Sequence, residues 1–149
     1  MRTEVSSTLR KLSIPEFTER LYGFTIPDAG KIYACDHDES FEITLSEAPE
    51  VEVLEDNPYE FIASFENALG VPDGVPIHRR NGIEIAYAFD GRNDFVNVTV
   101  RQGSHTEKLS FRTFSGDWFV GTISKCGKYL VLAEPYLFEC YEFTAPTAA

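Results

Sequence analysis

Alternation of apolar and polar residues is the dominant pattern in the second half of the chain. Apolar or aromatic residues occupy every second position from Ile83 to Phe89, and again from Val96 to Val100. This period of two is typical of strands with one buried face. Six such runs, separated by turn residues, are found at 83–90, 96–101, 108–112, 118–124, 129–133 and 136–143. They predict an antiparallel β-meander over 83–143, open or curved into a partial barrel.

The first half contains shorter strand patterns rich in carboxylates. Residues 31–35 are apolar enough for a buried strand, residues 41–45 alternate apolar and polar positions, and 51–53 add a short third run. A polar turn, 36–40, separates the first two runs. We therefore expect a set of acidic strands over 31–56.

Two segments have the signals of helices. In the N-terminal segment 1–30, Ser13 and Glu16 form a potential capping box, and Gly23 offers a stop. A second helix is predicted over 57–70, because Asn57 is a favourable N-cap and Pro58 suits the first helical position. An apolar stripe supports this second helix, through Phe61, Ile62, Phe65 and Leu69.

These elements predict an α+β fold. A helical N-terminal segment and one central helix would pack on a largely antiparallel β-meander sheet. A length of 149 residues without internal repeats or a low-complexity block favours one domain over 1–149. Within it, residues 144–149 are expected to form a frayed tail.

Charge is distributed unevenly along the chain. No lysine or arginine occurs in the 47 residues from Ile32 to His78, which carry 12 carboxylates. The net charge of −11 belongs to residues 1–75, whereas residues 76–149 are neutral. Concentrated like charge costs stability unless it is solvated or meets a cationic partner.

The composition favours a reducing compartment and argues against a membrane-spanning or secreted protein. No apolar run is long enough to cross a membrane, and the polar N-terminus from Met1 to Lys11 has no apolar segment typical of a secretory signal. Three scattered cysteines fit a reducing compartment better than a disulfide framework. We therefore expect a cytoplasmic protein without membrane contact.

No strong motif for catalysis, phosphate binding or metal binding is present. The cluster 35–39 combines a thiol, an imidazole and three carboxylates, but it lacks the EF-hand spacing and is typical of a solvated turn. A sequence pI of about 4.6 has the wrong sign for direct nucleic-acid binding. The sequence thus predicts no cofactor, no metal and no catalytic residue, and favours a protein that is not an enzyme.

The charge pattern favours a binding protein that contacts a basic partner in equal stoichiometry, as inhibitors and immunity-type proteins do. Its acidic face is predicted to consist of eight carboxylates with Tyr59 as an aromatic anchor. The carboxylates are Asp36, Asp38, Glu39, Glu47, Glu50, Glu52, Glu55 and Asp56.

Two other functions fit the sequence. The chain could be a small-molecule-binding protein or enzyme with a pocket between the curved sheet and the 57–69 helix. It could also be a structural or regulatory subunit whose edge strand, at 136–143, pairs with another chain. The sequence predicts neither the oligomeric state nor the identity of a partner.

Overall fold

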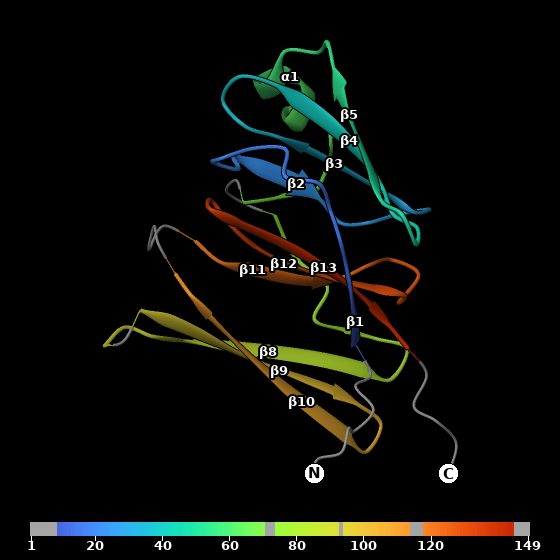
Figure 1. Cartoon of the computed structure of the whole chain (residues 1–149), viewed down its shortest axis with the longest axis vertical. Helices are drawn as coiled ribbons and strands as arrows, with labels where there is room; N and C mark the ends of the chain where they lie inside the picture. The colour runs from blue at the N-terminus through green and yellow to red at the C-terminus, as the bar shows by residue number, and fades with distance from the viewer. Residues whose placement is uncertain (1–8, 71–73, 93, 114–117, 145–149) are drawn as a thin grey trace.

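The computed structural model describes residues 9–70, 74–92, 94–113 and 118–144. Three antiparallel sheets lie one above another, and we call them the upper, central and lower sheets as they appear in Figure 1. Strands make up 53% of the described residues and helix 5%, so the fold is mostly β.

The upper sheet is built from the acidic first half of the chain and has the strand order β5-β4-β3-β2-β6. Its strands are β2 (Gly23–Thr25), β3 (Lys31–Cys35), β4 (Ser40–Thr44), β5 (Glu50–Leu54) and β6 (Ala68–Leu69). The short helix α1 (Pro58–Ala63) contacts β3 and lies above this sheet (Figure 1).

The central sheet has the order β1-β13-β12-β11 and combines both ends of the described chain. Its strands are β1 (Leu9–Leu12), β11 (Val120–Ile123), β12 (Tyr129–Glu134) and β13 (Leu137–Phe143). The lower sheet has the order β10-β9-β8-β7. Its strands are β7 (Arg79–Arg80), β8 (Ile83–Asp90), β9 (Phe95–Gln102) and β10 (His105–Arg112).

The central sheet is covered on both faces. In β12, Tyr129 and Val131 belong to the core between the central and upper sheets, whereas Leu130 and Leu132 belong to the core between the central and lower sheets. All six residues of β12 are therefore buried. A strand that is buried on both faces lacks the apolar–polar alternation of strands with one solvent-exposed face.

The expectation of an α+β fold is wrong at the N-terminal segment. Within the described part of 1–30, the chain forms β1, β2 and extended connections rather than a helix. The backbone N–H of Leu21 donates to the carbonyl of Pro135, and that of Tyr22 donates to Cys35. Hydrogen bonds to the β12–β13 turn and to β3 thus replace the local bonds that Ser13 and Glu16 would have initiated.

The central helix predicted over 57–70 begins as expected and ends early. Asn57 caps α1, because its Oδ1 accepts hydrogen bonds from the N–H groups of Tyr59 and Glu60 at 3.0 and 3.1 Å. Helix α1 stops at Ala63, and Leu69 instead lies in β6, paired with Phe24 of β2. Burial of Leu69 in the core between two sheets outweighs its place on a helical stripe.

The six predicted strands of 83–143 are present and antiparallel, but they do not form one meander. The first three make the lower sheet with β7, and the last three join the central sheet with β1. Two stacked sheets bury the apolar faces of both sets, which a single open sheet would leave half exposed. Strand β13, expected at an edge, lies between β1 and β12.

Candidate acidic binding surface

One end of the upper sheet gathers several of the predicted carboxylates. The register pairs Cys35 with Ser40 and Ser40 with Leu54, so the β3–β4 turn and the end of β5 lie at the same end of the sheet. The Ser40 hydroxyl also donates to the backbone carbonyl of Asp56 at 3.1 Å. We call this region the acidic end, and it consists of Asp36, Asp38, Glu39, Glu55 and Asp56.

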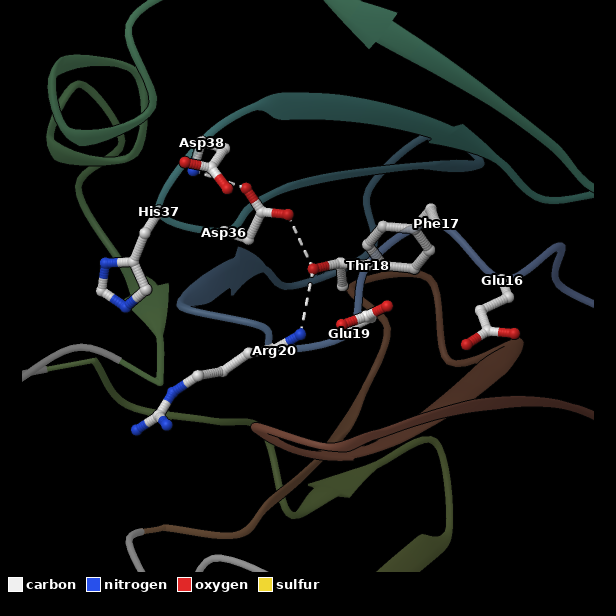
Figure 2. Close-up of a pocket in the computed structure, with 8 residues that line it drawn as sticks. All are labelled: Glu16, Phe17, Thr18, Glu19, Arg20, Asp36, His37 and Asp38. Atoms are coloured by element: carbon white, nitrogen blue, oxygen red, sulfur yellow. Dashed lines mark hydrogen bonds between the residues drawn. The ribbon is translucent and has the colours of Figure 1, made fainter.

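Asp36 organises the β3–β4 turn. Its Oδ1 accepts hydrogen bonds from the N–H groups of Asp38 and Glu39, both at 2.7 Å. Its Oδ2 accepts from the Thr18 hydroxyl at 2.7 Å, which joins the turn to the N-terminal segment (Figure 2). Asp36 therefore positions the turn, while Asp38 and Glu39 are exposed and available to a partner.

An aromatic cluster lies beside the acidic end. His37 Nδ1 and the Tyr59 hydroxyl share a hydrogen bond of 2.7 Å, and the Tyr22 ring lies 4.9 Å from the His37 ring and 5.4 Å from the Tyr59 ring. Tyr59 nevertheless keeps 47% of its surface exposed. The structure thus places the predicted aromatic anchor next to the turn, held in position and accessible.

The remaining predicted residues are separated from the acidic end. Glu50 and Glu52 are exposed on β5, an edge strand of the upper sheet, and Glu52 pairs with Glu42 of β4. Glu47 lies in the β4–β5 connection at the opposite end of the sheet, close enough to act on Arg10. Of the nine predicted residues, six therefore lie together, two extend along the edge strand, and Glu47 lies apart.

Several other carboxylates form ion pairs within the chain. Glu42 pairs with Lys31 at 3.5 Å, Glu84 with Arg79 at 2.8 Å, and Glu139 with Lys11 at 3.3 Å. Within the described ranges, none of the eight carboxylates predicted to form the acidic face has a cationic partner at ion-pair distance. Apart from Glu47, which acts on Arg10 beyond ion-pair distance, the negative field of these carboxylates is therefore not offset by an ion pair within the described chain.

A groove adjoins the acidic end and extends its charge. It has a volume of about 670 Å³ and lies between residues 16–20 and 36–38. Glu16 and Glu19 add carboxylates to Asp36 and Asp38, while the Arg20 guanidinium points away from the aspartates (Figure 2). Sequence reasoning missed Glu16 and Glu19, because 20 residues separate Glu16 from Asp36 and nothing local joins the two segments.

The thiol beside the acidic end is not a reactive nucleophile. Burial raises the pKa of the Cys35 thiol to about 11, with a further contribution from the Asp36 charge, so Cys35 stays protonated. In the part of the chain that the structure describes, no three His, Cys, Asp or Glu side chains are grouped to hold a metal ion.

A separate cavity of about 550 Å³ lies between the upper sheet and the residues that follow α1. The alternative interpretation places its pocket elsewhere, against the curved sheet predicted for 83–143. Tyr33 and Lys31 line one side, and Phe65 and Glu66 line the other. Charged groups there are partly engaged, since Lys31 donates to the Thr44 hydroxyl at 3.1 Å. This cavity contains no arrangement that indicates a particular ligand.

Comparisons with known proteins assign no family. A scan against models of protein families found no match, and searches of curated proteins and of solved structures found none either. Among the described residues, no helix has the length and apolar character needed to cross a membrane.

Proposed function

We propose that this protein binds a basic partner protein through the acidic end and the outer edge of the upper sheet. The observation that carries this proposal is the set of eight carboxylates without ion-pair partners among the described residues, five of them gathered beside Tyr59. Uncompensated charge of one sign accelerates encounter with an oppositely charged surface and orients it.

Affinity in such a complex comes chiefly from a buried aromatic centre. Tyr59 supplies this centre, because its ring is exposed and its hydroxyl is fixed by His37. The adjoining groove accepts a lysine or arginine side chain among Glu19, Asp36 and Asp38. The protein would act stoichiometrically, as an inhibitor or immunity-type protein that covers a cationic surface.

We further propose that the complex forms in the cytoplasm. All three cysteines are free, and Cys35 and Cys140 are buried. Buried thiols that are not crosslinked fit a reducing compartment. Direct binding to nucleic acid is disfavoured, because the phosphate backbone would be repelled by the same carboxylates.

Capture from native lysate with matched charge variants tests the proposal. The site variant E39Q/E55Q and the control variant E66Q/D94N each remove two exposed negative charges, so their net charge is equal. We expect the wild type and the control to retain a basic protein at about equal molar amount. The site variant should bind this protein about three- to tenfold more weakly, and added salt should release it.

Two results would contradict the proposal. Equal weakening by the two variants would show that net charge, rather than the acidic end, determines binding. Capture of no basic protein that is released by salt would contradict stoichiometric binding in that lysate. Tyr59→Ala supplies a further readout, since loss of the anchor should accelerate dissociation more than it slows association.

A further inference from the structure

The strand β5 forms an outer edge of the upper sheet. It stands last in the order β5-β4-β3-β2-β6, and Figure 1 shows it at the margin of that sheet. Within the described ranges, β4 is the one strand that pairs with it. The unpaired backbone groups of an edge strand are a template for a strand from another chain. In contrast, β13, the edge expected from the sequence, has a neighbour on each side.

The pairing of β3 with β4 determines which backbone groups of β5 face outward. The N–H of Leu45, which continues the register of β4, donates to the Gly30 carbonyl at 2.8 Å. Because hydrogen bonding alternates along an antiparallel strand, odd-numbered residues of β4 bond β3 and even-numbered residues bond β5. Their partners on β5 are Glu50, Glu52 and Leu54. The N–H and C=O groups of Val51 and Val53 therefore point outward, and within the described chain they have no hydrogen bond on that side.

The side chains of β5 differ between its two faces. Glu50 and Glu52 are exposed on one face. On the other face, Val51 packs against the core between the upper and central sheets, whereas Val53, paired with the buried Phe41, remains 54% exposed. A strand added beside β5 would cover Val53 and would place its alternate side chains next to the two glutamates.

The charge of β5 restricts which strand can pair with it. If the added strand is antiparallel, Glu50 and Glu52 occupy the non-hydrogen-bonded positions, where facing side chains approach most closely. In the described chain, neither glutamate has a cation at ion-pair distance. Lysine or arginine at the facing positions would pair with them, whereas a second copy of β5 would place glutamate against glutamate. The edge therefore favours a basic strand over self-association.

We propose that the partner adds an antiparallel strand to β5, with lysine or arginine facing the two glutamates and apolar residues facing the two valines. This inference rests on the proposed function and specifies the form in which the basic partner binds. Main-chain hydrogen bonds at Val51 and Val53 supply affinity, and Glu50 and Glu52 supply the preference for basic side chains. The acidic end, which adjoins the end of β5, contacts the rest of the partner.

Calorimetric titration of the full chain with two hexapeptides of equal composition tests the proposal. One peptide alternates lysine and valine, and the other has its lysines in one block and its valines in the next. We expect the alternating peptide to bind one site per chain, at least about fivefold more tightly than the block peptide. Its binding should also slow the hydrogen exchange of the Val51 and Val53 amides, measured by NMR. Equal binding of the two peptides, or no protection of these amides, would overturn the proposal.

Methylation of peptide nitrogens separates strand pairing from ionic attraction. In the alternating peptide, N-methylation of the valines that face Val51 and Val53 removes the N–H groups directed at β5. N-methylation of two lysines instead removes N–H groups directed away from β5 and leaves the charge unchanged, which makes it the matched control. We expect the valine-methylated peptide to bind at least about tenfold more weakly than the lysine-methylated one. Equal affinities would refute main-chain pairing with β5.

Val53→Pro tests the same pairing from the side of the protein. Because the N–H of Val53 points outward, proline removes a donor to the added strand and leaves the bonds to β4 in place. Val53→Thr keeps the N–H and the branched side chain, and serves as the control. Val53→Pro should bind the alternating peptide, and the basic protein captured from lysate, at least about tenfold more weakly than Val53→Thr. If Val53→Pro does not fold, the methylated peptides decide the question.

The outcomes distinguish this inference from the proposed function. A basic protein that both Val53 variants retain equally would refute strand addition and leave the proposed function in place. If the wild type captures no basic protein that salt releases, the proposed function fails. The peptide titrations then still show whether β5 accepts a basic strand.

Discussion

Asp36 is one of the carboxylates predicted to bind a basic partner, but it also has a structural role. Both of its carboxylate oxygens accept short hydrogen bonds, from two backbone N–H groups of its own turn and from Thr18. Asparagine keeps one acceptor for the turn and can donate to the threonine hydroxyl, whereas alanine can do neither. The charge of Asp36 and its hydrogen bonds can therefore be separated by substitution.

We predict that Asp36→Ala lowers the free energy of unfolding by about 1–3 kcal/mol, because three hydrogen bonds to a partly buried group are lost. Asp36→Asn should lower it by less than about 1 kcal/mol. Urea denaturation measures both values. Equal destabilisation by the two variants would show that the charge, and not the hydrogen bonding, stabilises the turn.

The three thiols should differ sharply in reactivity. Cys126 is exposed, whereas Cys35 and Cys140 are buried, and burial raises their pKa values to about 11 and about 12. Since the thiolate is the reactive species, brief alkylation of the native protein should modify Cys126 alone. Mass spectrometry of intact protein should show one adduct on the wild type and none on Cys126→Ser. Rapid modification of Cys35 or Cys140 in the folded protein would contradict the burial of these side chains.

At the scale of elements, most of the longer strands could be predicted from the sequence, but the short strands β1, β2, β6 and β7 and the grouping into sheets could not. Period-two alternation identified β8 and β9, because each has one face turned to solvent and one to the core. The capping residue Asn57 likewise marked the start of α1. Pairing partners depend on contacts between distant segments, and so β1, which joins β13, left no local signal.

The helical prediction for the N-terminal segment failed for a related reason. Phe17 and Leu21, four residues apart, would share a helical face, but Phe17 instead packs edge-on against Phe41 and Phe138 of two different sheets. A single side chain that bridges two layers gains more burial than a short isolated helix provides. Local helix propensity therefore predicts secondary structure poorly in a segment whose side chains pack between two sheets.

The pairing of β1 with β13 should depend on pH through Glu142. The Arg10 guanidinium, which hydrogen-bonds to this carboxylate, holds the pKa of Glu142 below its ordinary value of 4.5, and Lys128 contributes at 3.6 Å. A folded-state pKa below the unfolded value stabilises the protein above pH ~4.5, and this stabilisation is lost as the pH falls through the folded value.

Glu142→Gln should therefore lower the urea midpoint slightly at pH ~7 and have no such effect at pH ~2, where Glu142 is protonated in both states. Glu60→Gln provides the control, since Glu60 is exposed on α1 away from β13. A difference between Glu142→Gln and the wild type that persisted undiminished in acid would exclude ionisation of Glu142 as its cause.

At the scale of the whole molecule, the acidic half of the sequence forms a separate layer of the structure. The acidic stretch from Ile32 onward forms the upper sheet and α1, whereas the neutral half forms the lower sheet and most of the central sheet. Much of the acidic end could be proposed from sequence because Asp36, Asp38 and Glu39 are contiguous in a turn. The burial of Glu134, which is 1% exposed, could not be predicted, since a carboxylate after an apolar run is usually a surface residue.

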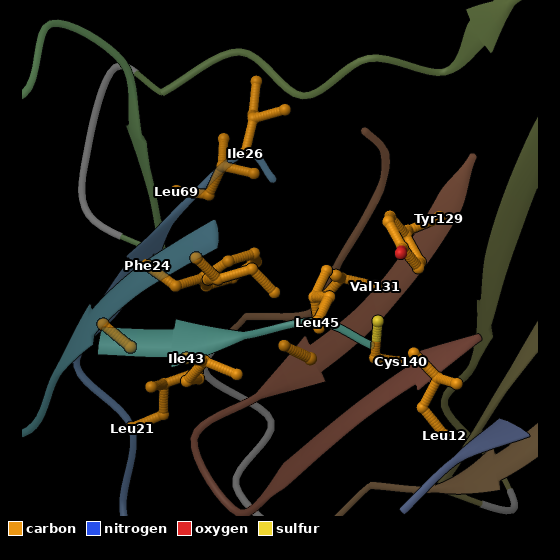
Figure 3. Close-up of a cluster of buried hydrophobic side chains, with 13 residues drawn as sticks. Leu12, Leu21, Phe24, Ile26, Ile43, Leu45, Leu69, Tyr129, Val131 and Cys140 are labelled. Atoms are coloured by element: carbon orange, nitrogen blue, oxygen red, sulfur yellow. The ribbon is translucent and has the colours of Figure 1, made fainter. Parts of the chain in front are cut away.

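The stacking predicts that the three sheets unfold as one cooperative unit. The core between the upper and central sheets joins Ile43 to Val131 and Cys140 (Figure 3), and Ile85 of the lower sheet belongs to the core on the other side. Loss of either outer sheet would expose a whole face of the central one, where every residue of β12 is buried. Ile43→Ala and Ile85→Ala, both fully or almost fully buried, should each lower the free energy of unfolding by about 2–5 kcal/mol.

Hydrogen exchange locates the effect of each substitution. If the sheets form one unit, Ile43→Ala should reduce the protection of the most stable amides in β9 of the lower sheet as much as in β4 of the upper sheet, and Ile85→Ala should do the same. A loss confined to the substituted layer would show instead that the upper sheet and the lower sheet unfold separately. Fluorescence of Trp118 and far-ultraviolet circular dichroism should then also give different midpoints, whereas one cooperative unit requires them to coincide.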